Sequence, residues 1–474
     1  PVWEYFEEIC KIPRLSKNEA KIRKYLLEFA VRHNLESKED TIGNILITKP
    51  AAPGWENRKS IVLQSHMDMV GEKNADHPHD WFNDAITPVI SGEWVTARGT
   101  TLGADDGIGI ASQLAILADK DLKAGRIECL FTVDEESGMT GAMNLTPDFF
   151  SGRILINLDS EDEGILYIGC AGGMDTVGTM KYNSAQVGKD TSALEISLTG
   201  LRGGHSGDEI HKGFGNSVKL MTRILRNLDE DYDISLVSFN GGNLRNAIPR
   251  EAFAEIVVEN RYLKQVIKRT NSFQLILSKE FGELEKELKI TVKEIALPSF
   301  TMDKENQEKL LDALSCCPHG TIAWSKEMEN LVETSTNLAS VRFNKDNTLT
   351  IVTTQRSSIE SSKHEVAAIV ESCLKLAGAE TELSDGYPGW KPDLTSEILK
   401  ITRNSYKKLF GKDPEIRAIH AGLECGLIYQ KFKQIDMISI GPTIRGAHTP
   451  EEKIEIKTTQ MFWDLLLDVI ESIP

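Results

Sequence analysis

A histidine and an aspartate stand directly after a run of apolar residues in the first part of the chain. The stretch 61–65 has the composition of a buried strand, His66 follows it, and Asp68 comes two residues later. Because parallel strands present functional side chains at their carboxyl ends, the imidazole of His66 is placed to ligate a metal ion. The carboxylate of Asp68 can then hold the other ring nitrogen. The pair makes a metal site only if further ligands reach the same edge of the sheet.

Four more potential ligands stand at the ends of predicted strands, at the start of a predicted helix or in a loop: Asp105, Glu136, Asp159 and His448. Together with His66 they make two histidines and three carboxylates, a set that suits a pair of divalent ions. Zinc is the first choice, with manganese and cobalt as alternatives. One carboxylate can bridge two such ions, which lower the pKa of a shared water and bind a carbonyl oxygen.

A hydrolytic reaction at such a site also needs a carboxylate that takes the proton of the water and delivers it to the leaving amine. Glu135, next to Glu136, is the candidate for this general base. Ordinary interpretations stay open as well: Glu135 and Glu136 as a solvated pair, the aspartates as turn residues, and His448 as a loop histidine. His77 and His79 form a competing pair, but no strand positions them, so surface histidines are the preferred interpretation there.

The elements that must position these side chains alternate along the first part of the chain. Apolar strands are predicted at 60–65, 126–134 and 153–158. A helix is predicted to follow Asp105, and another is expected over 16–33, where Ser16 and Glu19 have the spacing of a capping box. Strands that alternate with helices favour a mainly parallel α/β layer.

A different pattern begins after 169–174. Strands with alternating polar and apolar residues, long charged helices and a hairpin-type turn at 345–347 indicate an antiparallel sheet with helices. We therefore expect an α/β fold whose catalytic domain comes in two parts, 1–187 and 386–474. An α+β domain at 188–385 is expected to be inserted between them.

The composition excludes some classes of partner. The 474 residues carry a net charge of −17, which argues against nucleic-acid binding because that requires a basic face. The seven cysteines are odd in number and irregularly spaced, so we expect reduced thiols in a cytoplasmic protein. Neither a signal segment nor a membrane-spanning run is recognised, so no membrane partner is expected. Pro1 cannot start translation, so an initiator or short leader is expected before it.

Segments along nearly the whole chain resemble, in order, the aminoacyl-histidine dipeptidases. They include HMDMV (66–70), GTTLGADDGIGIA (99–111), TVDEESGMTGA (132–142), GLRGGHSGDEIHKG (200–213), FNGGNLRNAIPREAFA (239–254), IHAGLECGL (419–427) and SIGPTIRGAHTPEE (439–452). These dipeptidases are similar to the carnosinases and peptidase T, with which they form a family of co-catalytic zinc peptidases. The resemblance is far more specific than the spacing of the ligands.

The resemblance implies a role for each candidate ligand. One zinc ion would be held by His66, Asp105 and Asp159, and a second by Asp105, Glu136 and His448, with Asp105 bridging the two. It also implies that Glu135 is the general base, that Asp68 orients His66, and that the peptide bond after Asp105 is cis.

The resemblance further implies that the inserted domain is a lid through which two subunits form a homodimer. His205 would reach the active site of the neighbouring subunit, Asn246 would lie near the scissile carbonyl, and Arg356 would receive the carboxylate of the substrate. Gly422 and Glu424 would line the substrate pocket. Without the resemblance, His205 reads as a turn residue and Arg356 as a charge that keeps an edge strand soluble.

The expected activity is the metal-dependent hydrolysis of unblocked dipeptides, with two zinc ions per subunit and a preference for a C-terminal histidine. Within the family, another di- or tripeptidase or an acylamino-acid deacylase is the alternative. From a different class, the alternative is a binding protein that contains metal but has no activity.

Overall fold

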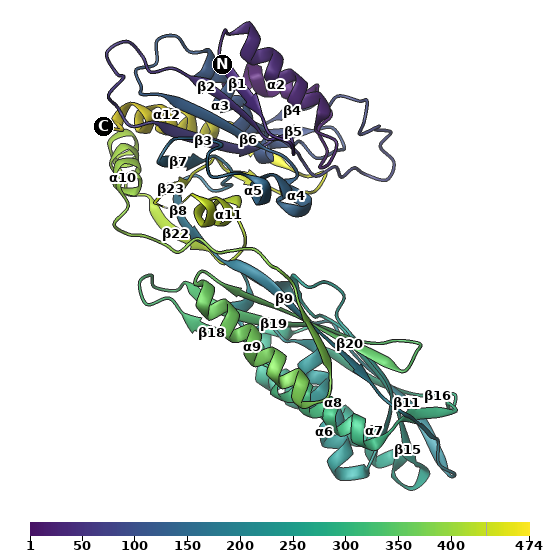
Figure 1. The fold of residues 1–474 in the computed structure, drawn as a ribbon. Coiled ribbons are helices and arrows are strands. Elements are labelled where there is room, and N and C mark those ends of the chain that lie inside the picture. Colours follow the sequence, from purple (N-terminus) through teal and green to yellow (C-terminus); the bar gives the residue numbers. More distant parts are fainter. Residues whose placement is uncertain (433) are drawn as a thin grey trace. The chain divides into compact units, whose positions relative to one another are not determined.

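The computed structural model describes residues 1–474 apart from 433, and its chain forms two compact units (Figure 1). The first unit comprises Pro1–Cys170, Trp390–Ile419 and Leu423–Pro474, and the second comprises Ala171–Gly389 and His420–Gly422.

The second unit begins earlier than the predicted residue 188 and ends later than the predicted residue 385. The reason is the strand β9 (Gly172–Lys181), which pairs along its length with β20 (Thr348–Ser357) and also with β21 (Glu380–Leu383). These pairs make β9 part of the sheet of the second unit.

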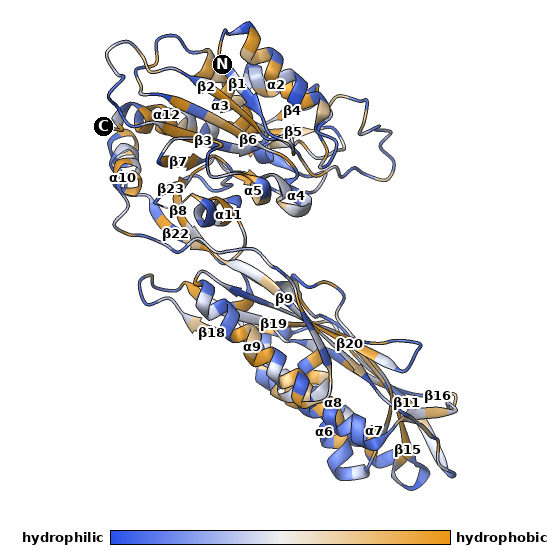
Figure 2. Ribbon diagram, in the orientation of Figure 1, coloured by the Kyte–Doolittle hydropathy of each residue, from blue (hydrophilic) through white to orange (hydrophobic). Residues whose placement is uncertain are grey.

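The first unit is built on an eight-stranded sheet with the order β1-β2-β6-β3-β7-β23-β8-β22. Its strands are β1 (Glu36–Glu39), β2 (Ile45–Lys49), β3 (Ile61–His66), β6 (Ile127–Thr132), β7 (Ile154–Asn157), β8 (Ile165–Cys170), β22 (Glu415–Ile419) and β23 (Asp436–Ser439). The central strands β6, β3, β7 and β23 run parallel, as predicted. Every residue of β3, β6 and β7 is buried, which is typical of a sheet covered on both faces. Figure 2 shows these strands as the apolar centre of the unit.

The helices of the first unit are α1 (Val2–Cys10), α2 (Ala20–Arg32), α3 (Ala104–Ala118), α4 (Glu135–Gly138), α5 (Thr140–Asn144), α10 (Glu397–Phe410), α11 (Glu424–Lys431) and α12 (Ile456–Ser472). A small sheet with the order β24-β25-β5-β4 completes the unit. Its strands are β4 (Pro88–Ser91), β5 (Trp94–Ala97), β24 (Ile444–Arg445) and β25 (Lys453–Glu455).

The second unit is built on a nine-stranded sheet with the order β16-β11-β15-β13-β19-β20-β9-β21, in which β18 also pairs with β19. Besides β9, β20 and β21, the strands are β11 (Thr191–Thr199), β13 (Ser235–Gly241), β15 (Ala252–Glu259), β16 (Lys289–Ile295), β18 (Gly320–Trp324) and β19 (Val332–Phe343). All of its strand pairs are antiparallel, as predicted.

Four helices pack with this sheet: α6 (Ser217–Tyr232), α7 (Leu263–Phe281), α8 (Lys304–Cys316) and α9 (Glu360–Leu376). Two short pairs lie outside it, formed by β10 (Ser184–Gln186) with β17 (Phe300–Met302) and by β12 (Gly204–His205) with β14 (Ala247–Ile248). Across the described residues, no helix is both long and apolar enough to cross a membrane. All seven cysteines are free thiols, as predicted.

Candidate metal centre

The parallel strands of the first unit end beside one another and carry the predicted ligands at that edge. His66 is the last residue of β3, and Glu135 and Glu136 open α4 shortly after β6 ends. Asp159 follows β7 by two residues, and Asp105 lies in the first turn of α3. The peptide bond between Asp105 and Asp106 is cis, as the family resemblance implied.

Asp105 stands between the two histidines. Its Oδ1 lies 3.1 Å from Nε2 of His66, and its Oδ2 lies 3.3 Å from Nε2 of His448. Each histidine has one further carboxylate: His66 Nε2 lies 3.4 Å from Asp159 Oδ1, and His448 Nε2 lies 2.9 Å from Glu136 Oε2. The side chains thus form two groups of three that could each hold an ion, and both groups contain Asp105.

The charges in this cluster fit divalent cations. Burial raises the pKa of Asp159 to about 7, and the neighbouring carboxylate of Asp105 adds to the rise. Glu161, which the sequence did not single out, has its pKa raised to about 8 by burial and by the same neighbour. Burial opposes ionisation of Asp105 too, but hydrogen bonds with His448 and His66 lower its pKa. A group of crowded, buried carboxylates with imidazoles is a donor set that zinc, manganese or cobalt can satisfy.

Asp68 ties the strand of His66 to the turn that carries the two glutamates. Its Oδ1 lies 3.4 Å from Nδ1 of His66 and accepts the backbone N–H of Glu135 at 3.0 Å. Its Oδ2 accepts the N–H of Glu136 at 3.2 Å and the hydroxyl of Ser16 at 2.8 Å. Burial opposes the charged form, but these partners lower the pKa of Asp68 to about 2. Asp68 is therefore an anion that fixes both the imidazole and the turn.

The helix predicted over 16–33 begins only at Ala20, and Ser16 and Glu19 do not form a capping box. Ser16 binds Asp68, and Oε1 of Glu19 accepts the backbone N–H of Asp134 at 3.1 Å. Both residues therefore support the glutamate turn. The prediction was wrong because the spacing of a capping box is local, whereas the partners of these side chains come from distant strands.

Glu135 is half-buried among the ligands, with carboxylate and imidazole atoms of His66, Glu135 and Glu136 within 4.8 Å of one another. Burial raises its pKa well above the ordinary value. A carboxyl group with a high proton affinity beside the ligand set has the position and chemistry of a general base.

Glu424, which the family resemblance placed at the substrate pocket, has a buried side chain. It belongs to the first unit, and its side chain is 0% exposed. Its Oε2 accepts hydrogen bonds from Gln64 Nε2 at 2.6 Å and from Thr132 Oγ1 at 2.7 Å. These partners come from β3 and β6 and satisfy one oxygen of the buried carboxylate, whereas Oε1 has no partner among the residues described.

The second unit holds a separate group of polar side chains around the loop 420–422. Arg356 is buried on β20, an interior strand, so it is not the edge-strand charge of the ordinary interpretation. Its Nη1 donates to the hydroxyl of Tyr387 at 2.7 Å, while Nε has no hydrogen-bond partner within the described part of the chain. Gly422 packs on the same tyrosine: a Cβ there would lie 2.7 Å from its ring.

His420 was not predicted as a site residue and lies in the same group. Its Nε2 lies 2.8 Å from the hydroxyl of Ser335, and its Nδ1 lacks a partner among the residues described. Burial and the nearby charge of Arg356 lower its pKa to about 3, so the imidazole is neutral. His420 lies within IHAGLECGL (419–427), one of the segments that carry the family resemblance, but no role was assigned to it, because nothing in the local sequence separates a buried polar histidine from a loop histidine.

His205 and Asn246 lie on neighbouring segments of the second unit. His205 is half-buried on β12, and its Nδ1 accepts the backbone N–H groups of Gly207 and Asp208 at 3.3 and 3.1 Å. The side chain of Asn246 is exposed, and its carbonyl accepts the N–H of Ser206 at 2.8 Å.

Comparisons with known proteins agree with this architecture. Residues 62–472 match the model of the peptidase family M20/M25/M40. The cytosol non-specific dipeptidase of Escherichia coli (strain K12) is 44% identical over 474 residues, which cover 100% of this chain and 98% of that protein.

The solved structures give the same result at the level of the fold. The aminoacylhistidine dipeptidase of Vibrio alginolyticus is 44% identical with a TM-score of 0.93, covering 100% of this chain and 96% of that one. The aminopeptidase PepT of Bacillus cereus matches with a TM-score of 0.57 at 17% identity, covering 100% and 98% of the two chains, and shows the fold alone.

Proposed function

The chain belongs to the peptidase family M20/M25/M40, and on that basis we propose that it is a metal-dependent dipeptidase with two metal ions per subunit. The observation that carries the proposal is the pair of three-residue ligand groups that share Asp105. The similarity to two dipeptidases over the whole chain supports the choice of dipeptides among peptide substrates. Zinc is the proposed ion, and manganese and cobalt suit the same donors.

The proposed preference is for unblocked dipeptides with a C-terminal histidine. The relative from Vibrio alginolyticus is an aminoacylhistidine dipeptidase, whereas the one from Escherichia coli is a non-specific dipeptidase. We therefore place Xaa-His peptides within the substrate range and expect other dipeptides to be cleaved as well.

In the proposed mechanism, His66, Asp105 and Asp159 would hold one ion, and Asp105, Glu136 and His448 would hold the other. When bound, the ions supply Lewis acidity that polarises the scissile carbonyl and makes a water molecule more acidic. Glu135 takes the proton of the attacking water and passes it to the leaving amine.

Glu135 and Glu136 are adjacent but receive different roles. The backbone N–H groups of both bind the carboxylate of Asp68, so the backbone that carries them is fixed. Glu136 lies against His448, and Glu135 faces a crowded interior that raises its pKa. Glu136, in contact with an imidazole, is the proposed ligand, and Glu135, whose pKa burial raises, is the proposed base.

The roles proposed for the second unit concern the substrate. A guanidinium that is buried, with Nε unpaired, favours Arg356 as the group that binds the carboxylate of a dipeptide. His205 and Asn246 are proposed to act near the scissile carbonyl, with His205 serving the active site of the neighbouring subunit. Gly422 leaves room for Tyr387, which positions Arg356.

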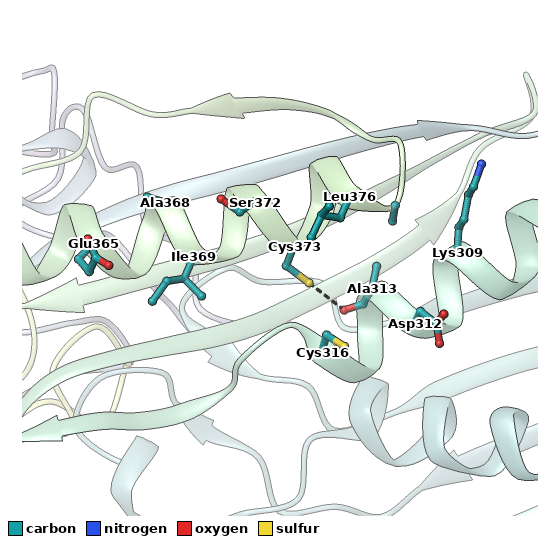
Figure 3. A pocket seen from close by; sticks show the side chains of 11 residues that line it. Lys309, Asp312, Ala313, Cys316, Glu365, Ala368, Ile369, Ser372, Cys373 and Leu376 are labelled. Carbon is teal, nitrogen blue, oxygen red and sulfur yellow. Dashed lines mark hydrogen bonds between the residues drawn. The ribbon is translucent and has the colours of Figure 1, made fainter.

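The proposed homodimer forms through the second unit, as the family resemblance implies. A groove of about 580 Å³ lies between α8 and α9 (Figure 3). Ile369 and Leu376 line it with 47% and 87% of their surface exposed, and such apolar exposure favours a second copy as the occupant.

Mixing Glu135→Gln and His205→Ala chains should restore activity if His205 acts across the dimer. If both variants are inactive and their mixture stays inactive after subunit exchange, His205 does not act across the dimer.

A cytoplasmic location is also proposed, because all seven cysteines are free thiols.

A panel of dipeptides, tripeptides and acylamino acids tests the proposed function, using chelated protein to which zinc, manganese or cobalt is returned separately. We expect metal-dependent cleavage of dipeptides, including Xaa-His. Preferential cleavage of tripeptides or acylamino acids would favour another activity of the family. Metal binding without any cleavage would favour the inactive binding protein instead.

A further inference from the structure

The loop that leads to Asp105 directs four consecutive backbone N–H groups at one carboxylate. Oε2 of Glu452 accepts from Leu102 at 2.8 Å and from Gly103 at 2.9 Å. Oε1 accepts from Ala104 at 2.7 Å and from Asp105 at 3.3 Å. Successive N–H groups of this kind form a concave anion site, and here a side chain of the chain itself fills it.

Arg14 holds the same loop through a carbonyl. Its Nη2 donates to the carbonyl of Gly103, and its Nη1 donates to the carbonyls of Met67 at 3.0 Å and Asp68 at 2.7 Å. Arg14 is itself fixed, because its own carbonyl accepts the N–H of Met69 at 3.1 Å. One guanidinium thus joins the segment after His66 to the loop before Asp105.

We propose that Glu452 and Arg14 are positioning residues for the shared ligand Asp105. Arg14 fixes the loop relative to His66, and Glu452 fixes it relative to His448. This inference rests on the proposed dimetal function and adds to it the groups that set where the shared carboxylate lies.

The link from Glu452 to His448 runs through one short turn. His448 has a positive φ of 64°, and the turn around it is closed by the N–H of Thr449 on the carbonyl of Gly446 at 3.2 Å. The N–H of Glu452 then binds the carbonyl of Thr449 at 3.0 Å. The residue that holds the loop of Asp105 is therefore hydrogen-bonded to the turn that carries His448.

The packing leaves Arg14 little freedom. A Cβ at Gly103 would lie 2.7 Å from Nη2 of Arg14, and a Cβ at Gly107 would lie 2.6 Å from the same atom. Gly103 also has a φ of 69°, a conformation that lets the neighbouring N–H groups converge. Glycine is needed at both positions so that the guanidinium can approach the backbone of the loop.

The test is Glu452→Gln, a change that keeps the shape of the side chain. Because each oxygen of Glu452 accepts two N–H groups, the new amide NH₂ must face two donors whichever way it turns. We expect metal affinity to fall by roughly 10- to 100-fold, the usual effect of removing a group that orients a metal ligand.

The matched control is Glu128→Gln in the same unit. Glu128 is 1% exposed and accepts the N–H groups of Ser151 at 2.9 Å and Gly152 at 2.7 Å. It lies near the start of β6, whereas the glutamate turn follows the end of that strand. We expect the control to lose stability but to keep the metal affinity of the wild type.

Three measurements read the outcome: calorimetric titration of chelated protein with manganese, electron paramagnetic resonance of the fully loaded protein, and hydrogen exchange of the amides of 102–105 in metal-free protein. In Glu452→Gln we expect weaker binding, altered magnetic coupling between the two ions and faster exchange. A loss of stability alone would change neither the manganese affinity nor the magnetic coupling between the ions. Arg14→Lys keeps the positive charge but cannot donate all three hydrogen bonds to the backbone carbonyls. It should change the manganese affinity and the magnetic coupling in the same direction, and it replaces Glu452→Gln if that variant does not fold.

Normal manganese affinity and normal hydrogen exchange in Glu452→Gln would overturn the positioning role but leave the proposed dimetal function intact. A wild-type protein that bound neither manganese nor zinc would contradict the proposed function as well.

Discussion

The candidate metal centre of the first unit and the polar group of the second unit are opposites in charge. The first gathers the carboxylates of Asp105, Glu136 and Asp159, and burial with like charges raises the pKa of Asp159. The second gathers Arg356, His205 and His420, and burial with the charge of Arg356 lowers the pKa of both histidines. The first group is rich in carboxylates, which suit cations. The second contains the guanidinium of Arg356, which we propose binds the carboxylate of a peptide.

The sites also differ in how they are held. The loops of the metal centre are fixed by side chains that bind backbone groups, among them Asp68, Glu452 and Arg14. In the second unit, Arg356 and His420 keep buried nitrogen atoms that have no partner in the part of the chain described. Among the described residues, Nδ1 of His66 in the metal centre also lacks a hydrogen-bond partner, so buried polar atoms of this kind accompany both sites. Each such atom calls for an explanation, and a bound ligand is one.

The largest expected effect belongs to the first unit. Glu135→Gln should lower kcat by roughly 10²- to 10⁴-fold, because the amide cannot take the proton of the attacking water. Metal content must be measured alongside, since Glu135 also lies close enough to His66 and Glu136 to be a ligand. Unchanged metal content with lost activity is the expected result. Loss of metal from the variant would indicate that Glu135 is a metal ligand. Near-normal activity would show that Glu135 is not the general base.

A smaller effect is expected in the second unit. Arg356→Lys should lower kcat/KM for dipeptides by roughly 10- to 100-fold, because a forked, charge-assisted pair with the carboxylate is lost. The loss should be much smaller for dipeptide amides, which lack that carboxylate. Arg342→Lys is the control, since Arg342 is exposed on the neighbouring strand β19. Equal losses on peptides and amides would show that Arg356 does not recognise the carboxylate.

The smallest expected effect concerns the stability of the protein at acidic pH. The pKa of His420 falls to about 3 in the folded chain because of burial and Arg356, whereas an unfolded histidine has a pKa of about 6.5. Below pH 6.5 the unfolded chain gains a proton that the folded chain does not, so His420 lowers stability as the pH falls toward 3.

Denaturant unfolding of metal-free protein between pH 7.5 and 4.5 checks this sign. Compared with the wild type, His420→Asn should show a shallower loss of stability on acidification, by up to ~1.4 kcal/mol per pH unit. Identical pH slopes for the two proteins would show that His420 is protonated in the folded state.

The parallel layer and the proximity of the proposed ligands could be predicted from the sequence for a physical reason. Apolar runs such as 61–65 mark strands buried on both faces, and their carboxyl ends must meet at one edge. His66, Glu136 and Asp159 follow such runs, so their proximity could be inferred without knowing the register of the sheet. His448 lies in a loop; it was a candidate ligand from its residue type, and the family resemblance assigned it to an ion.

Partners of backbone groups could not be predicted in this way. Arg14 and Glu452 bind carbonyl and N–H groups, which every residue carries, so no pattern of side chains points to them. Ser16 and Glu424 were assigned from local spacing or from a motif, but their partners come from distant strands. The change of pattern after 169–174 lies close to the boundary near residue 171, but the inserted domain was taken to begin at 188, because the pairing of β9 with the distant strand β20 cannot be read from local sequence.

The division of the chain at His420–Gly422 has a consequence for genetic engineering. These three residues belong to the second unit, although 419 and 423 on either side belong to the first. Removing 171–389 from the gene would therefore not remove the whole unit: it would leave behind His420 without Ser335 and Gly422 without Tyr387. A minimal one-unit protein would need a redesigned connection between 419 and 423, and exchange of this module between relatives would have to carry both stretches together.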